Sequence, residues 1–250
     1  MAFASHNFGR IQDKYDFRDY MAAPAPVGFQ LTRPVDLSPK FPYIFDQGQA
    51  GTCYAFSTME VIAFDEVKQG FSYVPKSPLF IAYNTSVIEG SVGQDAGGSL
   101  RDSFYSSAHQ GICDEVDWPY FIDRLGIQPP TTAYADALQH KVITYRRLIS
   151  PTQIDAILNA GWPISTGIPV FDNFPMQTST GKVSMPAFWS KEVGGHAIMI
   201  VGYDPASKLY KFANSWATTW GDNGYGYLPS KYLVRYMAEI DLWQVSVVLG

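Results

Sequence analysis

The amino-acid sequence predicts an α+β fold in which a mainly helical lobe faces a mainly antiparallel β lobe across a cleft. Its 250 residues are enough to bury the core of one large domain or of two lobes. Helical periodicity dominates before about residue 141, and short strand-like runs separated by Gly, Asp, Asn and Pro follow it. A cleft between two lobes is a common place for a functional site.

The predicted division has three parts. Residues 1–34 form an N-terminal extension that is polar, aromatic and punctuated by proline, and we expect it to be extended without a core of its own. Residues 35–141 form the mainly helical lobe, and residues 142–250 form the mainly β lobe. The sequence contains no internal repeat and no low-complexity tract.

The clearest helix is predicted from Cys53 to Gln69, with Thr52 as its N-cap and Gly70 as its stop signal. Its apolar residues recur at three- and four-residue spacing and form one stripe: Phe56, Met59, Ile62, Ala63 and Val67. Further helices are expected over residues 77–87, 99–110, 133–138 and 151–160.

The second half contains the strand-like runs, which cover residues 142–145, 163–170, 196–203, 209–214, 224–229 and 243–249. The sequence Asp204-Pro205-Ala206-Ser207 is typical of a turn between two adjacent antiparallel strands.

Composition argues against several classes of partner. The formal net charge is -5 and no basic stripe is present, so we expect no nucleic-acid partner. The N-terminus lacks the pattern of a secretory signal, and the apolar runs are too short to span a bilayer, so we expect no membrane partner. Two cysteines cannot build a disulfide framework, although they allow one bridge, and Cys113 is expected to be a buried free thiol.

The candidate nucleophile is Cys53, which follows a Gly-containing turn and begins the predicted helix. The positive end of the helix dipole stabilises a thiolate, and the thiolate is the nucleophilic form. Taken alone, a cysteine in this position is more often a small buried hydrophobic residue.

Two later residues favour the interpretation of Cys53 as a nucleophile over that of a buried hydrophobic residue. His196 follows two glycines and opens a predicted strand, and Asn214 ends the next strand. In an antiparallel hairpin the two side chains lie side by side, so that the Asn fixes the imidazole tautomer and the other ring nitrogen faces Cys53. Nucleophile, base and orienting residue are the components of covalent catalysis.

The segments around these residues resemble the sequence blocks of papain-like cysteine peptidases. The chain has Gln47-Gly48-Gln49-Ala50-Gly51-Thr52-Cys53, Gly97-Gly98, Gly195-His196-Ala197 and Asn214-Ser215-Trp216, in the order of that family. The 143 positions between Cys53 and His196 fall within the separation of about 130–150 found in that class. The resemblance covers residues 35–245 and implies a two-lobe fold with a helical lobe and an antiparallel, β-barrel-like lobe.

The resemblance implies a role for each of these residues. Cys53 would attack the scissile carbonyl, and His196 would be its ion-pair partner and would protonate the leaving amine. Asn214 would orient His196, with Trp216 shielding that contact from water. Gln47 would donate its side-chain amide to the oxyanion.

Three glycines are the expected substrate-binding positions besides Trp216. Gly97 and Gly98 would let an extended substrate backbone approach closely, and Gly195 would open the specificity pocket or make its turn flexible.

The chain departs from the family pattern at Ala50, where the family often has a disulfide cysteine, and at Tyr54, where it usually has Trp. The Ala50 pattern resembles a disulfide-poor branch found in bacteria. Near the C-terminus, Glu239 and Asp241 could favour a basic substrate side chain, but a surface or core-edge position is the simpler interpretation for both acids.

The N-terminal extension has two interpretations of equal weight. It is an arm packed on the surface, or it crosses the cleft and limits access to Cys53. The extension is too short for the long helical propeptide that is usual in the family.

The resemblance implies a monomeric thiol endopeptidase that hydrolyses polypeptides through an acyl-thioester and needs no metal or other cofactor. One alternative is an acyl or glutaminyl transferase with the same triad. Another is a latent or silent relative that binds peptides. The sequence leaves the cellular compartment open.

Overall fold

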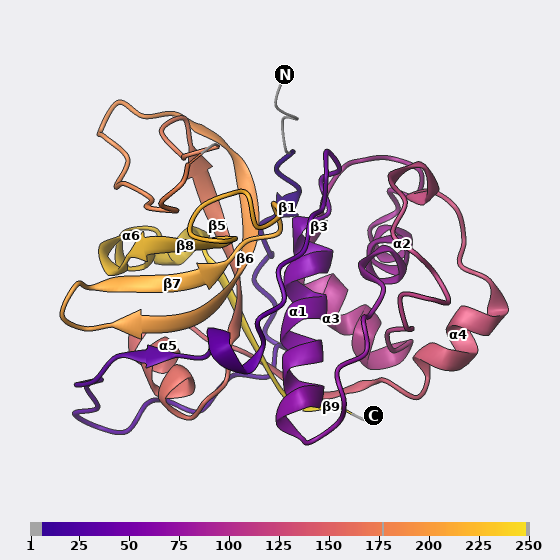
Figure 1. Ribbon diagram of the computed structural model, residues 1–250, viewed down its shortest axis with the longest axis horizontal. Coiled ribbons are helices and arrows are strands. Elements are labelled where there is room, and N and C mark those ends of the chain that lie inside the picture. Colours follow the sequence, from indigo (N-terminus) through magenta and orange to yellow (C-terminus); the bar gives the residue numbers. More distant parts are fainter. Residues whose placement is uncertain (1–6, 177, 249–250) are drawn as a thin grey trace.

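The computed structural model describes residues 7–176 and 178–248. Two lobes lie side by side, and helix α1 (Cys53–Lys68) runs along the boundary between them (Figure 1). Every residue of α1 from Cys53 to Glu66 is buried, because one face packs on the helical lobe and the other on the sheet. The predicted apolar stripe is therefore only one of two covered faces.

The helical lobe surrounds α1 with α2 (Pro78–Glu89), α3 (Leu100–His109) and α4 (Thr131–Ala137). Ser77 caps α2 by accepting a hydrogen bond of 3.1 Å from the Phe80 N–H, and Gly90 ends it in the left-handed conformation. A short strand, β3 (Gly98–Ser99), precedes α3 and faces the other lobe.

The second lobe is an antiparallel sheet with the order β4-β9-β5-β6-β7-β8. Its strands are β4 (Val142–Arg147), β5 (Ile164–Phe171), β6 (Glu192–Asp204), β7 (Leu209–Ala213), β8 (Tyr225–Pro229) and β9 (Asp241–Val248). Helices α5 (Pro151–Asn159) and α6 (Ser230–Arg235) complete the lobe. Within the described residues β4 and β8 do not pair with each other, so the sheet is open rather than a closed barrel.

The predicted elements are confirmed to within a few residues at their ends, with two differences. Thr52 stands at the N-cap of α1, but its hydroxyl forms a 2.7 Å hydrogen bond with the Tyr120 hydroxyl instead of capping the helix. His196 lies inside β6 and does not open it, because the strand already begins at Glu192.

A buried hydrogen-bond cluster joins α1 to the sheet. The Ser57 hydroxyl donates to the carbonyl oxygen of Ile198 over 2.9 Å and lies 2.7 Å from the Ser165 hydroxyl. The two lobes are thereby held together directly behind the first turn of α1.

The N-terminal segment follows the boundary between the lobes. Strand β1 (Arg10–Ile11) pairs in parallel with β3 and also contacts β6, so it lies between the helical lobe and the sheet (Figure 1). Further along, the backbones of Tyr20 and Ala22 exchange hydrogen bonds of 2.8 Å with Arg147. We call residues 7–22 the arm.

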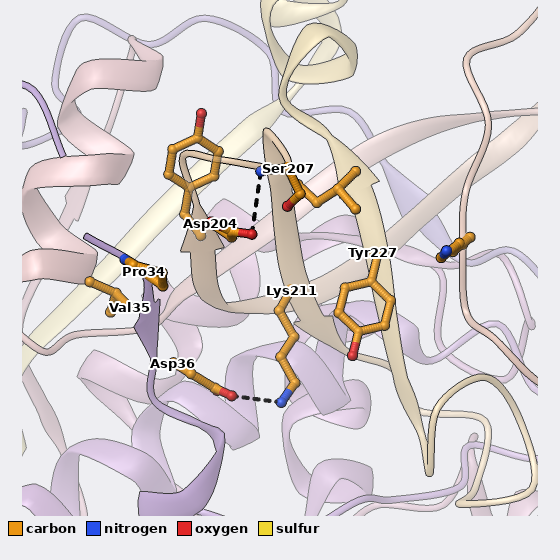
Figure 2. A pocket seen from close by; sticks show the side chains of 10 residues that line it. Pro34, Val35, Asp36, Asp204, Ser207, Lys211 and Tyr227 are labelled. Carbon is orange, nitrogen blue, oxygen red and sulfur yellow. Dashed lines mark hydrogen bonds and ion pairs between the residues drawn. The ribbon is translucent and has the colours of Figure 1, made fainter. Parts of the chain in front are cut away.

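After an exposed stretch, the chain joins the sheet at β2 (Val35–Asp36), which pairs with β6. The Asp36 carboxylate forms an ion pair with the Lys211 ammonium, with 2.8 Å between Oδ2 and Nζ. This pair lies at the edge of a surface pocket of about 340 Å³ (Figure 2). This pocket is lined mainly by β2, β6, β7 and β8 and includes none of the predicted site residues.

Candidate active site

The Cys53 side chain is completely buried at the first position of α1. Its sulfur accepts a hydrogen bond of 3.4 Å from the backbone N–H of Ala197, the residue after His196 on β6. The predicted nucleophile from one lobe and the predicted base from the other are therefore adjacent.

His196 and Asn214 lie side by side across the β6–β7 hairpin, as the sequence predicts. The Nε2 atom of His196 is 2.8 Å from Oδ1 of Asn214, and both side chains are buried. An amide oxygen accepts only from a protonated nitrogen, so this contact places a proton on Nε2.

Aromatic rings cover the contact between His196 and Asn214. The indole of Trp216 lies 4.8 Å from the imidazole of His196, measured between ring centroids, at an interplanar angle of 32°. The Phe174 ring stands 6.3 Å from the same imidazole. Such a cover excludes water and strengthens the hydrogen bond to Asn214.

Three hydrogen bonds hold the side-chain amide of Gln47. Its oxygen accepts from the Ser215 hydroxyl over 2.7 Å, and its nitrogen donates to the carbonyls of Ala50 over 2.8 Å and Asn7 over 3.2 Å. Ser215 thus directs the NH₂ group of Gln47 toward a peptide carbonyl of the arm. Ser215 was not identified as a site residue from the sequence, although it stands beside Asn214.

Gly9 of the arm lies directly against the nucleophile loop. A Cβ atom on Gly9 would be 1.7 Å from the carbonyl oxygen of Gly51, so only glycine fits here without displacement. The Gly9 carbonyl accepts a 2.8 Å hydrogen bond from the N–H of Gly98.

The three predicted substrate-binding glycines all border the arm. A Cβ on Gly97 would be 2.2 Å from the Gly9 oxygen, and a Cβ on Gly195 would be 2.5 Å from the Arg10 oxygen. Gly98 donates its N–H to the arm, and its own Cα packs on the ring of Tyr54, where a Cβ would be 2.6 Å away. Arm backbone therefore occupies the space predicted for substrate backbone.

Phe8 completes the cover over the predicted base. Its ring lies 6.0 Å from the His196 imidazole and 6.2 Å from the Trp216 indole, measured between centroids. The arm thus touches the predicted oxyanion donor through Asn7, the predicted base through Phe8 and the nucleophile loop through Gly9.

Burial raises the pKa of the Cys53 thiol above its usual value, although the backbone N–H groups of Ala197 and Gly9 oppose that shift. In the arm-covered protein, desolvation therefore outweighs the donors that favour a thiolate. The helix terminus alone does not make this cysteine reactive.

The two acids near the C-terminus differ from each other. Asp241 is fully buried and forms an ion pair with Arg10 of the arm, so the simpler interpretation of a surface or core-edge acid is wrong for it. Glu239 contacts the same arginine only through its backbone carbonyl. Neither Arg10 nor Phe8 was identified as a site residue from the sequence, because nothing near them in the chain indicates their partners.

Cys113 is a buried free thiol, as predicted, and Cys53 is also free. A group of metal-ligand type formed by Asp114, Asp136 and His140 lies in the helical lobe. The ammonium of Lys76 is 2.8 Å from Asp114, so a cation already compensates that charge. In the described part of the chain, no helix has the length and apolar character needed to cross a membrane.

The family model described as "Papain family cysteine protease" matches residues 35–238. An uncharacterized peptidase C1-like protein of Acanthamoeba polyphaga mimivirus is 33% identical over 98% of this chain and 88% of its own length. Cathepsin K of Gallus gallus is 29% identical, and the match covers 72% of this chain and 53% of that protein.

Among solved structures, xylellain, a cysteine protease from Xylella fastidiosa, is 29% identical and superposes with a TM-score of 0.90 over 97% of both chains. The digestive procathepsin L 3 of Tenebrio molitor larval midgut shares the fold with a TM-score of 0.74, covering 98% of this chain and 77% of that one at 16% identity. The few cysteines of this chain are consistent with the disulfide-poor branch.

Proposed function

This chain belongs to the papain family of cysteine proteases, and we propose that it is an endopeptidase with a Cys53–His196–Asn214 triad that its own arm holds latent. The fold and the thiol protease class follow from the family. We propose the roles of the individual residues, the acyl-thioester intermediate and the latency that the arm imposes. The observation that carries it is the passage of the arm over Gln47, His196 and Gly51.

In the proposed mechanism His196 takes the Cys53 proton, and the thiolate attacks the scissile carbonyl. The carbonyl oxygen becomes negative and accepts hydrogen bonds from the Gln47 amide and from the backbone N–H of Cys53. His196 then protonates the leaving amine as the C–N bond breaks, which leaves a thioester. Water adds to the thioester with His196 as base, and the C–S bond breaks to regenerate the thiol.

Asn214 acts on this cycle by orienting the imidazole. Its 2.8 Å contact with Nε2 leaves Nδ1 as the atom that exchanges a proton with Cys53 and with the leaving group. Trp216 and Phe174 keep water from that contact.

The path of the arm supports endopeptidase action. A continuous backbone passes between the lobes and continues beyond them, since β1 pairs with β3 and the chain runs on to Asp13 and Ala22. On this side of the site, an extended substrate therefore has room to continue past the reaction centre.

Two contacts hold the arm backbone at the predicted reaction centre. Strand β1 pairs in parallel with β3, and the Asn7 carbonyl accepts a hydrogen bond from the Gln47 amide. With Cys53 completely buried, a substrate carbonyl cannot reach the sulfur until the arm moves. Latency is therefore the resting state that this geometry supports.

The test displaces the arm in the full chain with Gly9→Val, since a side chain at Gly9 collides with Gly51. The control is Ala23→Val, which places the same side chain at an exposed position of the N-terminal segment. Hydrolysis of an unstructured protein should rise in Gly9→Val and stay at the wild-type level in Ala23→Val.

A cysteine-directed epoxide followed by peptide mapping identifies the nucleophile in the same proteins. Cys53 should be labelled in Gly9→Val, and adding His196→Ala should abolish both the label and hydrolysis. An unlabelled Cys53 in Gly9→Val, with the protein folded, would refute the proposed roles. Equal hydrolysis by wild type and Gly9→Val would refute latency alone.

A further inference from the structure

The nucleophile loop, residues 47–52, separates the two proposed oxyanion donors. The Gln47 side chain stands at its beginning, and the backbone N–H of Cys53 follows directly after its end. Two preorganised donors act together only when both point to the place where the negative charge develops. The loop has no covalent link that would hold its ends together, because both cysteines of the chain are free. Non-covalent contacts must therefore fix its shape.

The hydroxyl group of Tyr120 bridges the two ends of this loop. It donates a hydrogen bond of 2.8 Å to the backbone carbonyl of Gln47 and lies 2.7 Å from the hydroxyl of Thr52, the residue before Cys53. A phenol has one proton, so the Thr52 hydroxyl is the donor in the second contact. Burial raises the pKa of Tyr120 above its usual value, which keeps that proton on the phenol.

Tyr120 is itself fixed against helix α1. Its backbone N–H donates to Oε1 of Glu115 over 2.7 Å, and its ring stands edge-on to the ring of Phe56, with 4.9 Å between the centroids. Phe56 is buried in the first turn of α1, the turn that begins with Cys53. The bridging hydroxyl therefore has a defined position relative to the proposed nucleophile.

The backbone of Gln47 is held from both lobes. Its N–H donates to the carbonyl of Ser215 in the β lobe over 2.9 Å, and its carbonyl accepts from Tyr120 in the helical lobe. Asp95 of the helical lobe also contacts the loop, where it accepts a 2.8 Å hydrogen bond from the N–H of Gly51. Tyr120 differs from these contacts because it joins the first residue of the loop to the last.

We propose that Tyr120 is a positioning residue for the reaction, and that its hydroxyl keeps the Gln47 amide and the Cys53 N–H at the separation that the oxyanion requires. It acts through the loop and not by contact with the reacting atoms. The inference rests on the proposed function and adds to it a residue of the helical lobe. The competing interpretation is that the hydroxyl only stabilises the fold.

The test compares two reactions of Cys53 in the full chain with Gly9→Val, so that the arm is displaced. Peptide hydrolysis passes through an oxyanion, whereas alkylation by iodoacetamide forms a C–S bond, releases iodide and forms none. Adding Tyr120→Phe should lower kcat for a peptide about 10- to 100-fold with little change in KM, because a small misplacement of a catalytic group has an effect of this size. The rate of Cys53 alkylation should stay the same.

The matched control is Tyr134→Phe in the same background. It removes a hydroxyl from the same lobe, and the 2.8 Å hydrogen bond that is lost joins Tyr134 of α4 to Asn84 of α2. Both kcat and the rate of alkylation should equal those of Gly9→Val.

Thr52→Val removes the donor at the other end of the bridge and leaves the tyrosine in place, so it also tests the inference if Tyr120→Phe fails to fold. Alone it should lower kcat and leave alkylation unchanged. The double variant with Tyr120→Phe should lose no more kcat than Tyr120→Phe does, because the two hydroxyls form one bridge. Additive losses would show that they act separately and would refute the bridge.

The remaining outcomes separate the inference from the proposed function. If hydrolysis and alkylation fall together in Tyr120→Phe, or if only KM changes, the hydroxyl does not position the oxyanion donors. Unchanged hydrolysis in both Tyr120→Phe and Thr52→Val would likewise overturn the inference, and the proposed function would stand. Folded Gly9→Val protein that neither hydrolyses peptides nor is alkylated at Cys53 would contradict the proposed function itself, and the inference with it.

Discussion

Gln47 is the residue at which the two lobes and the arm meet. Its amide oxygen accepts from Ser215, while its amide nitrogen points to the carbonyl of Asn7. A peptide carbonyl already sits at the proposed oxyanion donor, so the arm imitates the ground state of a substrate at this point.

Gln47→Ala on the Gly9→Val background should lower kcat by about 10²–10³, the cost of losing one preorganised oxyanion donor. KM should change little, because the contact strengthens as charge develops on the oxygen. Ser215→Ala is the matched control, since it removes only the hydroxyl that orients the amide, and its loss in kcat should be smaller. Steady-state kinetics measure both, and a loss confined to KM would contradict the oxyanion role.

The sequence predicts a candidate-site residue only where its immediate sequence neighbours form a recognisable block. Cys53, His196, Asn214 and Gln47 each stand in a short sequence block, so the order of the blocks predicts their roles. The Arg10–Asp241 pair spans 231 positions of the chain, and neither residue has a distinctive neighbourhood. Only the fold brings that cation and that carboxylate together.

At the scale of elements, the arm changes the chemistry of α1. The helix N-terminus favours a thiolate at Cys53, but burial beneath the arm raises the pKa of that thiol above its usual value. The arm contributes to this burial, while its Gly9 N–H and its Arg10 charge lower the pKa of the thiol, and burial is the larger effect.

Alkylation of Cys53 by iodoacetamide should consequently depend on the arm and on pH. A raised pKa keeps the thiol protonated up to a higher pH, so wild type should react only under alkaline conditions. In Gly9→Val water reaches the sulfur, the desolvation penalty falls, and the rate profile should move to lower pH. Superimposable profiles for the two proteins would contradict this account of the arm.

Helix α1 also carries two buried glutamates with different environments. Among the described residues Oε1 of Glu60 has no hydrogen-bond partner, and burial raises the pKa of this carboxyl group well above its usual value. Glu66 instead pairs with Lys76 at 3.5 Å and with His140 at 3.0 Å.

The free energy of unfolding should respond to these glutamates in opposite ways. Folded Glu60 keeps its proton while unfolded Glu60 loses it, so this group lowers wild-type stability as pH rises above the unfolded pKa of about 4.3. Glu60→Gln should therefore be stabilising relative to wild type, increasingly so from pH 5 to pH 8. Glu66→Gln should be destabilising, because it removes the ion pair with Lys76 and weakens the hydrogen bond with His140.

The denaturant midpoints of wild type, Glu60→Gln and Glu66→Gln at pH 5 and at pH 8 measure these differences in stability. A Glu60→Gln protein that loses stability relative to wild type as the pH rises would show that the carboxylate is paired.

The element pattern was largely predictable because apolar periodicity is a local property. The helices and strands from α1 to β9 lie within a few residues of their predicted ranges, except β3 and α6, which the sequence did not predict. The prediction missed that α1 is covered on both faces and that the sheet stays open, since both depend on how the elements assemble. The Thr52 hydroxyl does not cap α1, because it forms a hydrogen bond with the hydroxyl of Tyr120, which is distant in the sequence.

At the scale of the whole molecule, the two lobes bring Cys53 and His196 together and the arm fills the space between them (Figure 1). The sequence left the course of residues 1–34 undecided between the surface and the cleft. That segment has no core of its own, so its path depends on complementary groups elsewhere: Gly51, Gly98 and Asp241. Such complementarity is visible only in the assembled fold.

The central claim is that Cys53 is a nucleophile that the arm covers, and trapping of the acyl-enzyme tests it most directly. Full-length Gly9→Val and wild type are mixed briefly with an activated ester of a short peptide, quenched in acid and mapped by mass spectrometry. The account predicts an acyl group on Cys53 in Gly9→Val, little or none in wild type, and none on Cys113 in either protein. Acylation at Cys113, equal acylation of Cys53 in both proteins, or an unmodified Cys53 in folded Gly9→Val would contradict it.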